Sequence, residues 1–159
     1  GYVTGYMHNL SPGSYMGIRG PYGRGYPVER FYGKEVLILG GGCGLAPIRS
    51  LLFALEHIKD HLEKVILCYG SKTPEDCIYK PLFARLNSID KFEAYRTVDK
   101  GDEGWDGPVG VAPSLLNNIK VDINNSVAVV CGPPIMMKFG TLKILEMGYR
   151  DDQDRKSVV

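Results

Sequence analysis

Runs of consecutive apolar residues alternate along the chain with segments in which apolar residues recur every three or four positions. Runs at residues 35–39, 65–69 and 127–130 are typical of strands that are buried on both faces of a sheet. A more polar run at residues 92–97 predicts a fourth strand, nearer an edge. The helical spacing predicts helices at residues 47–62, 82–86, 112–119 and 135–145.

Local signals mark where some of these elements begin and end. Thr73, followed by Pro74 and two acids, is typical of a helix start, and Gly148 is expected to end the last helix. Residues 98–110 predict a loop. Strands that alternate with helices over short connections predict an α/β fold with a doubly wound parallel sheet and right-handed crossovers.

The first 32 residues follow a different pattern. They are rich in glycine, proline and tyrosine, and only residues 14–19 predict a strand, which follows a turn at residues 11–13. This segment resembles the end of an all-β unit with a connector, too small to fold alone.

Two glycine-rich turns join a predicted buried strand to a predicted helix. The first glycine turn is residues 41–47, Gly-Gly-Cys-Gly-Leu-Ala-Pro, and the second is residues 131–137, Cys-Gly-Pro-Pro-Ile-Met-Met. Glycine relieves backbone crowding, and the helix that follows directs free N–H groups at whatever lies beyond the strand. Two such turns suggest a phosphate site and a ring site for a dinucleotide. Pro47 departs from the ordinary G-x-G-x-x-G pattern, and a plain strand-to-helix connector is the alternative for the first turn.

The turn after the second strand, residues 70–73, would face the adenosine ribose in a dinucleotide fold. An acid there selects NAD, whereas a cation or hydroxyl tolerates a 2′-phosphate. Ser71 and Lys72 precede the first acid, Glu75, so the turn leans towards NADP. A solvated helix-capping turn explains these residues equally well.

Composition narrows the function classes. The 159 residues are 44% hydrophobic and 23% charged with a net charge of +1, so no strong field recruits nucleic acid or anionic lipid. No apolar stretch is long enough to span a bilayer. The four cysteines lack metal-finger spacing and favour a reduced, cytoplasmic setting. His57 and His61 are four residues apart on a predicted helix, but a solvated face explains them better than a metal site.

Cys131 is the residue that most resembles a nucleophile. A thiol at a helix N-terminus has a lowered pKa, so a thiol-based enzyme is one alternative, although no histidine lies nearby in sequence. The pair Met136-Met137, by itself, is typical of a hydrophobic core.

Four motifs in this order resemble the ferredoxin–NADP reductase superfamily. They are Arg19-Gly20-Pro21-Tyr22-Gly23, the first glycine turn, Gly104-Trp105 with Gly110-Val111, and the second glycine turn. The resemblance covers residues 1–153. Within the superfamily the sequence is most similar to sulfhydrogenase gamma subunits, the flavin-containing subunit of anaerobic sulfite reductase and the electron-transfer subunit of dihydroorotate dehydrogenase.

The resemblance implies which residues bind NAD(P)H. The first turn would contact the pyrophosphate, Ser71 and Lys72 would lie near the ribose, and the second turn would flank the nicotinamide. Cys131 would be the catalytic residue in a positioning sense, because the flavin performs the hydride chemistry. The implied cofactor-binding residues are Gly41, Gly42, Cys43, Gly44, Leu45, Ala46, Pro47, Gly70, Ser71, Lys72, Cys131, Gly132, Pro133 and Met136.

The resemblance also implies a domain plan. Residues 1–32 would be the C-terminal remnant of a flavin-binding β-barrel and its hinge, residues 33–153 the NAD(P)-binding domain, and residues 154–159 a tail. The ligands of the [2Fe–2S] cluster found in relatives are absent from this sequence. FAD is expected in the full-length protein and not in this chain alone, which we expect to be inactive by itself.

The implied partner is a redox subunit of hydrogenase, sulfite reductase or dihydroorotate dehydrogenase type. Leftover barrel strands would expose an edge, which makes a homodimer possible. The alternative from another class is a non-catalytic interaction or regulatory module that retains the fold.

Overall fold

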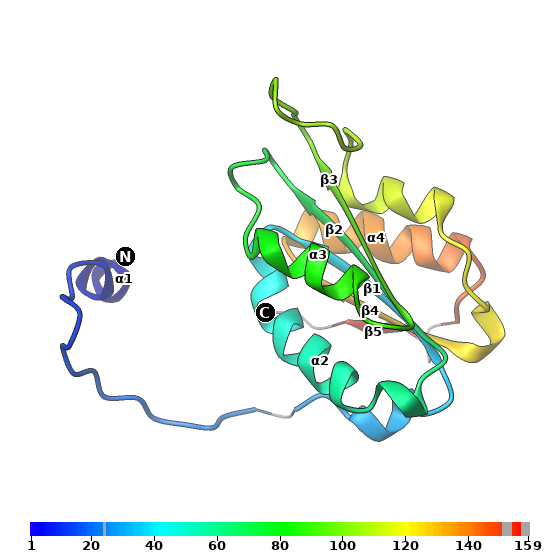
Figure 1. Cartoon of the computed structure of the whole chain (residues 1–159), viewed down its shortest axis with the longest axis horizontal. Coiled ribbons are helices and arrows are strands. Elements are labelled where there is room, and N and C mark those ends of the chain that lie inside the picture. The colour runs from blue at the N-terminus through cyan, green and yellow to red at the C-terminus, as the bar shows by residue number, and fades with distance from the viewer. Residues whose placement is uncertain (24, 151–153, 157–159) are drawn as a thin grey trace.

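Five parallel strands form the centre of the described structure, a computed structural model that describes residues 1–23, 25–150 and 154–156 (Figure 1). The strands lie in the order β3-β2-β1-β4-β5. Their bounds are β1 (Glu35–Gly41), β2 (Lys64–Ser71), β3 (Phe92–Val98), β4 (Ser126–Cys131) and β5 (Asp154–Lys156). Each neighbouring pair is parallel, as the alternation of strands and helices predicts.

Helices cover both faces of this sheet. One face is covered by α2 (Leu45–His57) and α3 (Lys80–Asn87), and the other by α4 (Pro134–Glu146) and the 3₁₀ helix η4 (Ala112–Asn118). The prediction of a doubly wound α/β fold is therefore confirmed. The remaining helices are α1 (Tyr2–His8) and the short 3₁₀ helices η1 (Val28–Phe31), η2 (Gly42–Gly44), η3 (Lys59–His61) and η5 (Ile123–Asn125).

Alternate residues of the central strands face the two helical layers. In β1, Val36 and Ile38 pack with α2, whereas Leu37 and Leu39 pack with η4 and α4. All four side chains are completely buried. A strand whose two faces are both covered has no position for a polar residue, which explains the continuous apolar runs.

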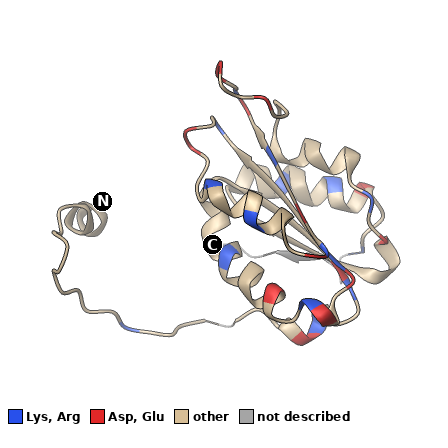
Figure 2. Ribbon diagram, in the orientation of Figure 1, with Lys and Arg blue, Asp and Glu red and all other residues tan. Residues whose placement is uncertain are grey.

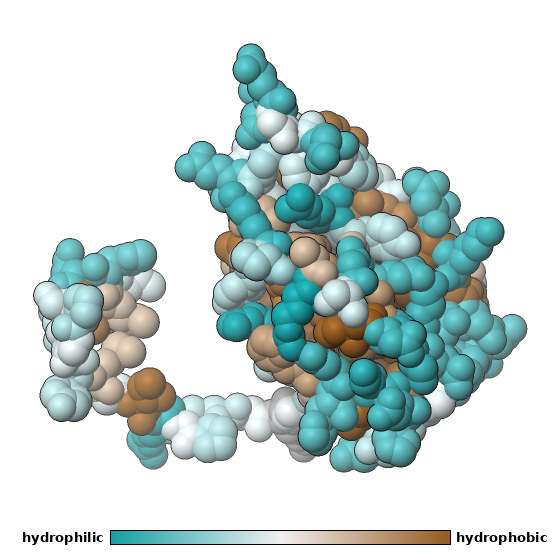
Figure 3. All heavy atoms as spheres, viewed as in Figure 1, coloured by the Kyte–Doolittle hydropathy of each residue, from teal (hydrophilic) through white to brown (hydrophobic). Residues whose placement is uncertain are grey.

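The strand predicted at residues 14–19 is wrong. This segment has no regular structure, and the preceding residues form α1 instead. Tyr15 is 98% exposed. A strand needs a neighbour for its hydrogen bonds, and none of the described strands pairs with this segment. In Figures 1 and 3 the N-terminal segment lies apart from the sheet, with apolar side chains on its surface.

The helix start predicted at Thr73 is also wrong. The Thr73 hydroxyl accepts a hydrogen bond from the Asp76 amide at 3.3 Å and donates one to its carboxylate at 2.8 Å. These bonds close a turn that does not continue as a helix. Tyr79 then adopts a left-handed conformation with φ of 52°, and α3 begins at Lys80. The helix predicted at residues 112–119 is present, but as the 3₁₀ helix η4.

Residues 154–156, expected in a tail after the domain, add an edge strand to the sheet. The backbone of β5 pairs in parallel with residues 128–130 of β4. The rest of the expected tail lies outside the described residues.

The periodic apolar residues of α4 correctly predict a helix but not its buried face. Ile135, Phe139 and Leu142 are about half exposed or more, whereas Gly140, Thr141 and Ile144 face the sheet. A Cβ atom on Gly140 would collide with the Leu39 side chain. The glycine therefore lets α4 pack closely on β1, and the bulkier residues point outward.

A buried hydrogen bond joins the end of the domain to β4. The Ser126 hydroxyl donates to the Tyr149 hydroxyl at 2.7 Å, and both side chains are buried. Burial raises the pKa of Tyr149 from its usual value near 10 to about 12. Burial likewise raises the pKa of Tyr69 to about 12. Both hydroxyls are buried in the protonated form, so folding is opposed once they ionise. Their contribution to the free energy of unfolding is therefore fully present below pH 10 and is lost as the pH rises towards 12.

We predict that Tyr149→Phe lowers the free energy of unfolding by about 1 kcal/mol at pH 7, because Ser126 loses its buried partner. The same variant should reduce, but not abolish, the loss of stability above pH 10, since Tyr69 still titrates there. Urea unfolding at a series of pH values measures both effects. Tyr95→Phe, at an exposed edge position, is the control and should change neutral stability by less than about 0.5 kcal/mol. An unchanged alkaline dependence in Tyr149→Phe would contradict this account.

Candidate functional site

The two glycine turns lie side by side where the strand order reverses. From β1 the chain passes through α2 to β2 on one side, whereas β4 pairs with β1 on the other. The first turn follows β1 and the second follows β4, with Gly40 paired in register with Cys131. Ligands of doubly wound sheets bind at this kind of reversal, beyond the carboxyl ends of the strands.

Backbone packing between the turns accounts for two of their glycines. A Cβ atom on Gly44 would collide with the carbonyl group of Cys131. A Cβ atom on Gly132 would first meet Met136 Cε, and it would lie 3.0 Å from the carbonyl oxygen and 3.1 Å from the nitrogen of Gly41. No side chain fits at Gly44, and one at Gly132 would have to displace Met136, so both glycines let the two backbones approach closely.

Gly42 has a different role. Its φ of +52° lies in the left-handed region, where side chains other than glycine are disfavoured. A Cβ atom there would meet nothing closer than Pro133 Cγ at 3.9 Å. The space beside Gly42 is therefore open, which leaves room for a ligand to approach the backbone.

Met136 and Pro133 of the second turn cover the start of the first. A Cβ atom on Gly41 would lie 2.9 Å from Met136 Cε and 3.6 Å from Pro133 Cδ. Met136 also packs on the core beneath α4, as the Met136-Met137 pattern predicts. It is half-buried, and Pro133 is exposed.

The first turn presents few side chains to solvent. Cys43 and Ala46 are exposed and Pro47 is half-buried, whereas Leu45 belongs to the core. Any ligand contact from Gly41, Gly44 or Leu45 would therefore come from the backbone.

Tyr69 supports the first turn from the neighbouring strand β2. The sequence did not identify this residue as part of the site. The fully buried ring lies on β2, and its hydroxyl donates a hydrogen bond to the Gly42 carbonyl at 3.1 Å. With its pKa raised to about 12 by burial, the hydroxyl stays protonated at neutral pH. The sequence did offer a signal for this role, because Tyr69 ends an apolar run and directly precedes Gly70.

Cys131 is enclosed rather than presented as a nucleophile. The residue is 1% exposed, and burial raises the pKa of its thiol, with a smaller contribution from Cys43. This is the opposite of the lowered pKa expected at a helix N-terminus. The thiol therefore stays protonated at neutral pH.

Of the three residues at the end of β2 that were predicted to contact the nucleotide, Gly70, Ser71 and Lys72, only Lys72 is exposed. Gly70 packs on η4, where a Cβ atom would lie 2.6 Å from that of Ala112. Ser71 is buried, and its hydroxyl donates to the Thr73 carbonyl at 2.9 Å. Lys72 is exposed. Figure 2 shows acidic residues farther out, along the loops that follow β2 and β3.

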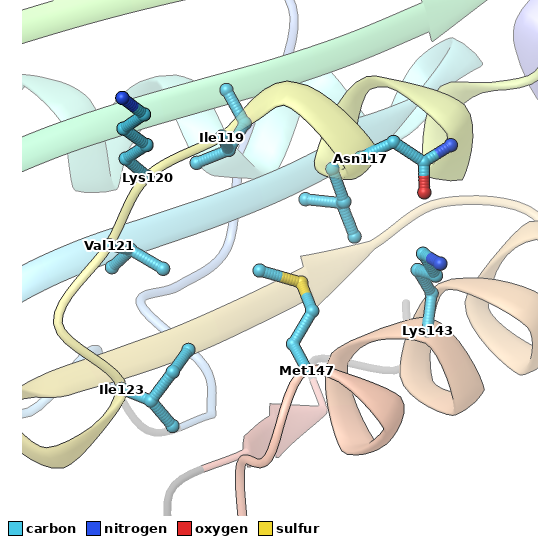
Figure 4. A pocket seen from close by; sticks show the side chains of 8 residues that line it. Asn117, Ile119, Lys120, Val121, Ile123, Lys143 and Met147 are labelled. Carbon is cyan, nitrogen blue, oxygen red and sulfur yellow. The ribbon is translucent and has the colours of Figure 1, made fainter.

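A separate hollow of about 490 Å³ lies at the other end of the strands. It is lined by Leu116, Asn117, Ile119, Lys120, Val121, Ile123, Lys143 and Met147 (Figure 4). The adjoining Asp122 amide donates to the carboxylate of Glu35, the first residue of β1, which places the hollow away from the glycine turns.

Within the described residues, no group of three or more potential metal ligands is close enough to hold an ion. His57 ends α2, whereas His61 lies in η3 and packs on Tyr32 at 5.2 Å, so they do not share one helix. None of the described helices has the length and hydropathy of a membrane span.

Comparison with known proteins identifies the fold and its relatives. The family described as oxidoreductase NAD-binding domain matches residues 38–141. Sulfhydrogenase 2 subunit gamma of Pyrococcus furiosus is 33% identical over 93% of the chain and 55% of that protein. A probable dihydroorotate dehydrogenase B (NAD(+)) electron transfer subunit from Methanothermobacter thermautotrophicus is 31% identical over 92% and 49%. The chain thus spans about half the length of these curated relatives.

A solved structure also matches. The ferredoxin NADP+ reductase from Neisseria gonorrhoeae, with bound FAD and NADP, superimposes with a TM-score of 0.67 at 26% identity. The match covers 82% of this chain and 58% of that one. The predicted resemblance to ferredoxin–NADP reductases is confirmed.

We predict that thiol labelling separates Cys43 from Cys131. Iodoacetamide at pH 7.5 should modify the exposed Cys43 first, and Cys131 should react at least about tenfold more slowly because its thiol is buried and protonated. Mass spectrometry of peptides after timed quenching measures both rates. Cys43→Ser is the control for any effect of one thiol on the other. Faster labelling of Cys131 than of Cys43 would contradict the structure and revive the thiol-enzyme alternative.

Proposed function

The chain belongs to the oxidoreductase NAD-binding domain family, and on that premise we propose that it binds NAD(P)H across the two glycine turns. The pyrophosphate lies on the backbone of the first turn and the nicotinamide on the second. The chain then acts as the nucleotide-binding domain of a flavin-dependent reductase that exchanges electrons with a redox partner protein.

The observation that carries this proposal is the contact between the turns at the strand reversal. The left-handed Gly42 lies beside open space. The free N–H groups that begin α2 suit an anion there. The second turn lies against the first through Gly44 and Gly132, so a ligand that occupies one turn reaches the other.

Cys131 has a positioning role in this proposal. Its buried, protonated thiol makes no nucleophile at neutral pH. The exposed Pro133 and half-buried Gly132 form the accessible part of the second turn, and the nicotinamide ring packs there. Cys131 sets the position of Gly132 because its carbonyl group packs on Gly44.

The flavin is proposed to come from outside the nucleotide-binding fold. The ferredoxin reductase that this chain resembles contains FAD together with NADP, and the curated relatives are about twice as long as the matched region. Bound flavin supplies the hydride acceptor. The part of this chain that the structure describes holds and orients the nicotinamide nucleotide.

The names of the relatives support an electron-transfer role. One is the gamma subunit of a sulfhydrogenase and another an electron transfer subunit. We therefore place the chain in an assembly in which a second protein gives or receives the electrons.

We predict that the purified chain binds NADPH or NADH saturably and retains no stoichiometric FAD. Gly42→Asp should weaken binding by about 100-fold or more, because a carboxylate beside a pyrophosphate costs several kcal/mol at short range. Aspartate tolerates left-handed φ, so the fold should persist. Isothermal titration calorimetry measures affinity, and circular dichroism checks the fold.

Asn118→Asp adds the same charge at an exposed site on η4 and should bind like the wild type. If the folded wild-type chain binds neither nucleotide, the proposed function is wrong.

A further inference from the structure

Arg49 lies between the first glycine turn and the loop after β2. It forms no ion pair with any described residue. Arg49 lies on α2, one helical turn beyond Ala46. Its guanidinium carbon is 4.7 Å from the centre of the Tyr79 ring and 5.0 Å from that of Phe53. None of the ion pairs between described residues includes Arg49.

Arg85 also packs on the Phe53 ring, but unlike Arg49 it forms an ion pair within the fold. Arg85 of α3 lies 5.1 Å from the Phe53 ring centre, and it donates to both carboxylate oxygens of Glu56, at 2.7 and 2.6 Å. Its charge is therefore satisfied within the fold. Arg49 has the same kind of aromatic support, but it is exposed and no described carboxylate pairs with it.

Tyr79 reaches Arg49 at a conformational cost. Its left-handed φ of 52° is uncommon for a residue other than glycine, and backbone strain of this kind clusters at functional sites. Tyr79 ends the loop that begins at Ser71 and Lys72, where the adenosine ribose is expected. Tyr79 thus brings the end of this loop into contact with Arg49.

We propose that Arg49, held between Tyr79 and Phe53, binds the 2′-phosphate of NADP(H) and gives this chain a preference for NADPH over NADH. This inference rests on the proposed nucleotide-binding function. Stacking on two rings restricts the guanidinium in advance, so less side-chain entropy is lost when it binds an anion. A guanidinium also presents paired donors that match a phosphate group.

The charges around the loop after β2 are consistent with an anion there. Lys72 begins the loop and Lys80 follows Tyr79, and both are exposed. Figure 2 shows the basic residues carried by α2 and α3. Of the two acids in the loop, Asp76 is engaged by the Thr73 hydroxyl. Arg49, Lys72 and Lys80 therefore outnumber Glu75 and Asp76, and the adjoining Asp99 and Lys100, whose amides bond to Ser71 and Lys72, add one charge of each sign.

The test compares two arginines and two nucleotides. NADPH and NADH differ only in the 2′-phosphate, so the ratio of their dissociation constants isolates that group. Arg49→Gln should weaken NADPH binding by about 10- to 100-fold, the size of a charged hydrogen-bonded contact, and NADH binding by less than about threefold. Arg49→Lys should retain part of the preference. The preference of the wild type should shrink as salt concentration rises.

Arg85→Gln is the matched control, and thermal unfolding of every variant shows whether the arginine only joins α2 to α3. The Arg85 variant should lose stability and keep the wild-type ratio. An Arg49→Gln variant that loses stability but keeps the ratio would overturn the inference, and so would an equal loss of NADPH and NADH, which indicates a pyrophosphate contact. A wild-type chain that prefers NADH also overturns it, whereas binding of neither nucleotide overturns the proposed function itself.

Discussion

The backbone of Gly44 packs directly on the carbonyl group of Cys131, and the geometry of the site depends on this contact. The contact brings together two turns that are almost ninety residues apart in the sequence. The parallel pairing of β1 with β4 places Gly40 opposite Cys131, so both turns begin at the same level along the sheet. A side chain at Gly44 would separate them, and under the proposed function a dinucleotide could then not span both.

Well-packed elements surround this contact. Each turn follows a strand whose side chains are buried on both faces, and Tyr69 fixes the Gly42 carbonyl from the neighbouring strand. The site is therefore formed mainly by backbone atoms on well-packed elements, which favours binding without a large rearrangement. The proposed function assigns discrimination between related ligands to exposed side chains at its edges, such as Lys72 and Arg49.

Much of this fold could be predicted from the sequence, because strands buried on both faces and amphipathic helices have distinct periods. Residues 35–39 and 127–130 fall within β1 and β4 for that reason. Two of the failures share a cause, which is dependence on distant neighbours, whereas the failed helix start at Thr73 is local, because its hydroxyl bonds to Asp76. Residues 14–19 lack a strand partner, and the side of α4 that faces the sheet is set by Gly140 against Leu39. The positions of both glycine turns were predicted, but the burial of Cys131 and the contacts of Tyr69 and Arg49 arise only in three dimensions.

The central claim is that one ligand occupies both glycine turns at once. A titration of the isotopically labelled chain with NADPH, followed by amide chemical shifts, tests it most directly. The account predicts that the amides of Gly42, Gly44 and Gly132 shift together along one binding curve. Shifts confined to one turn, or centred on Lys120 and Lys143 around the hollow at the opposite end of the strands, would contradict it.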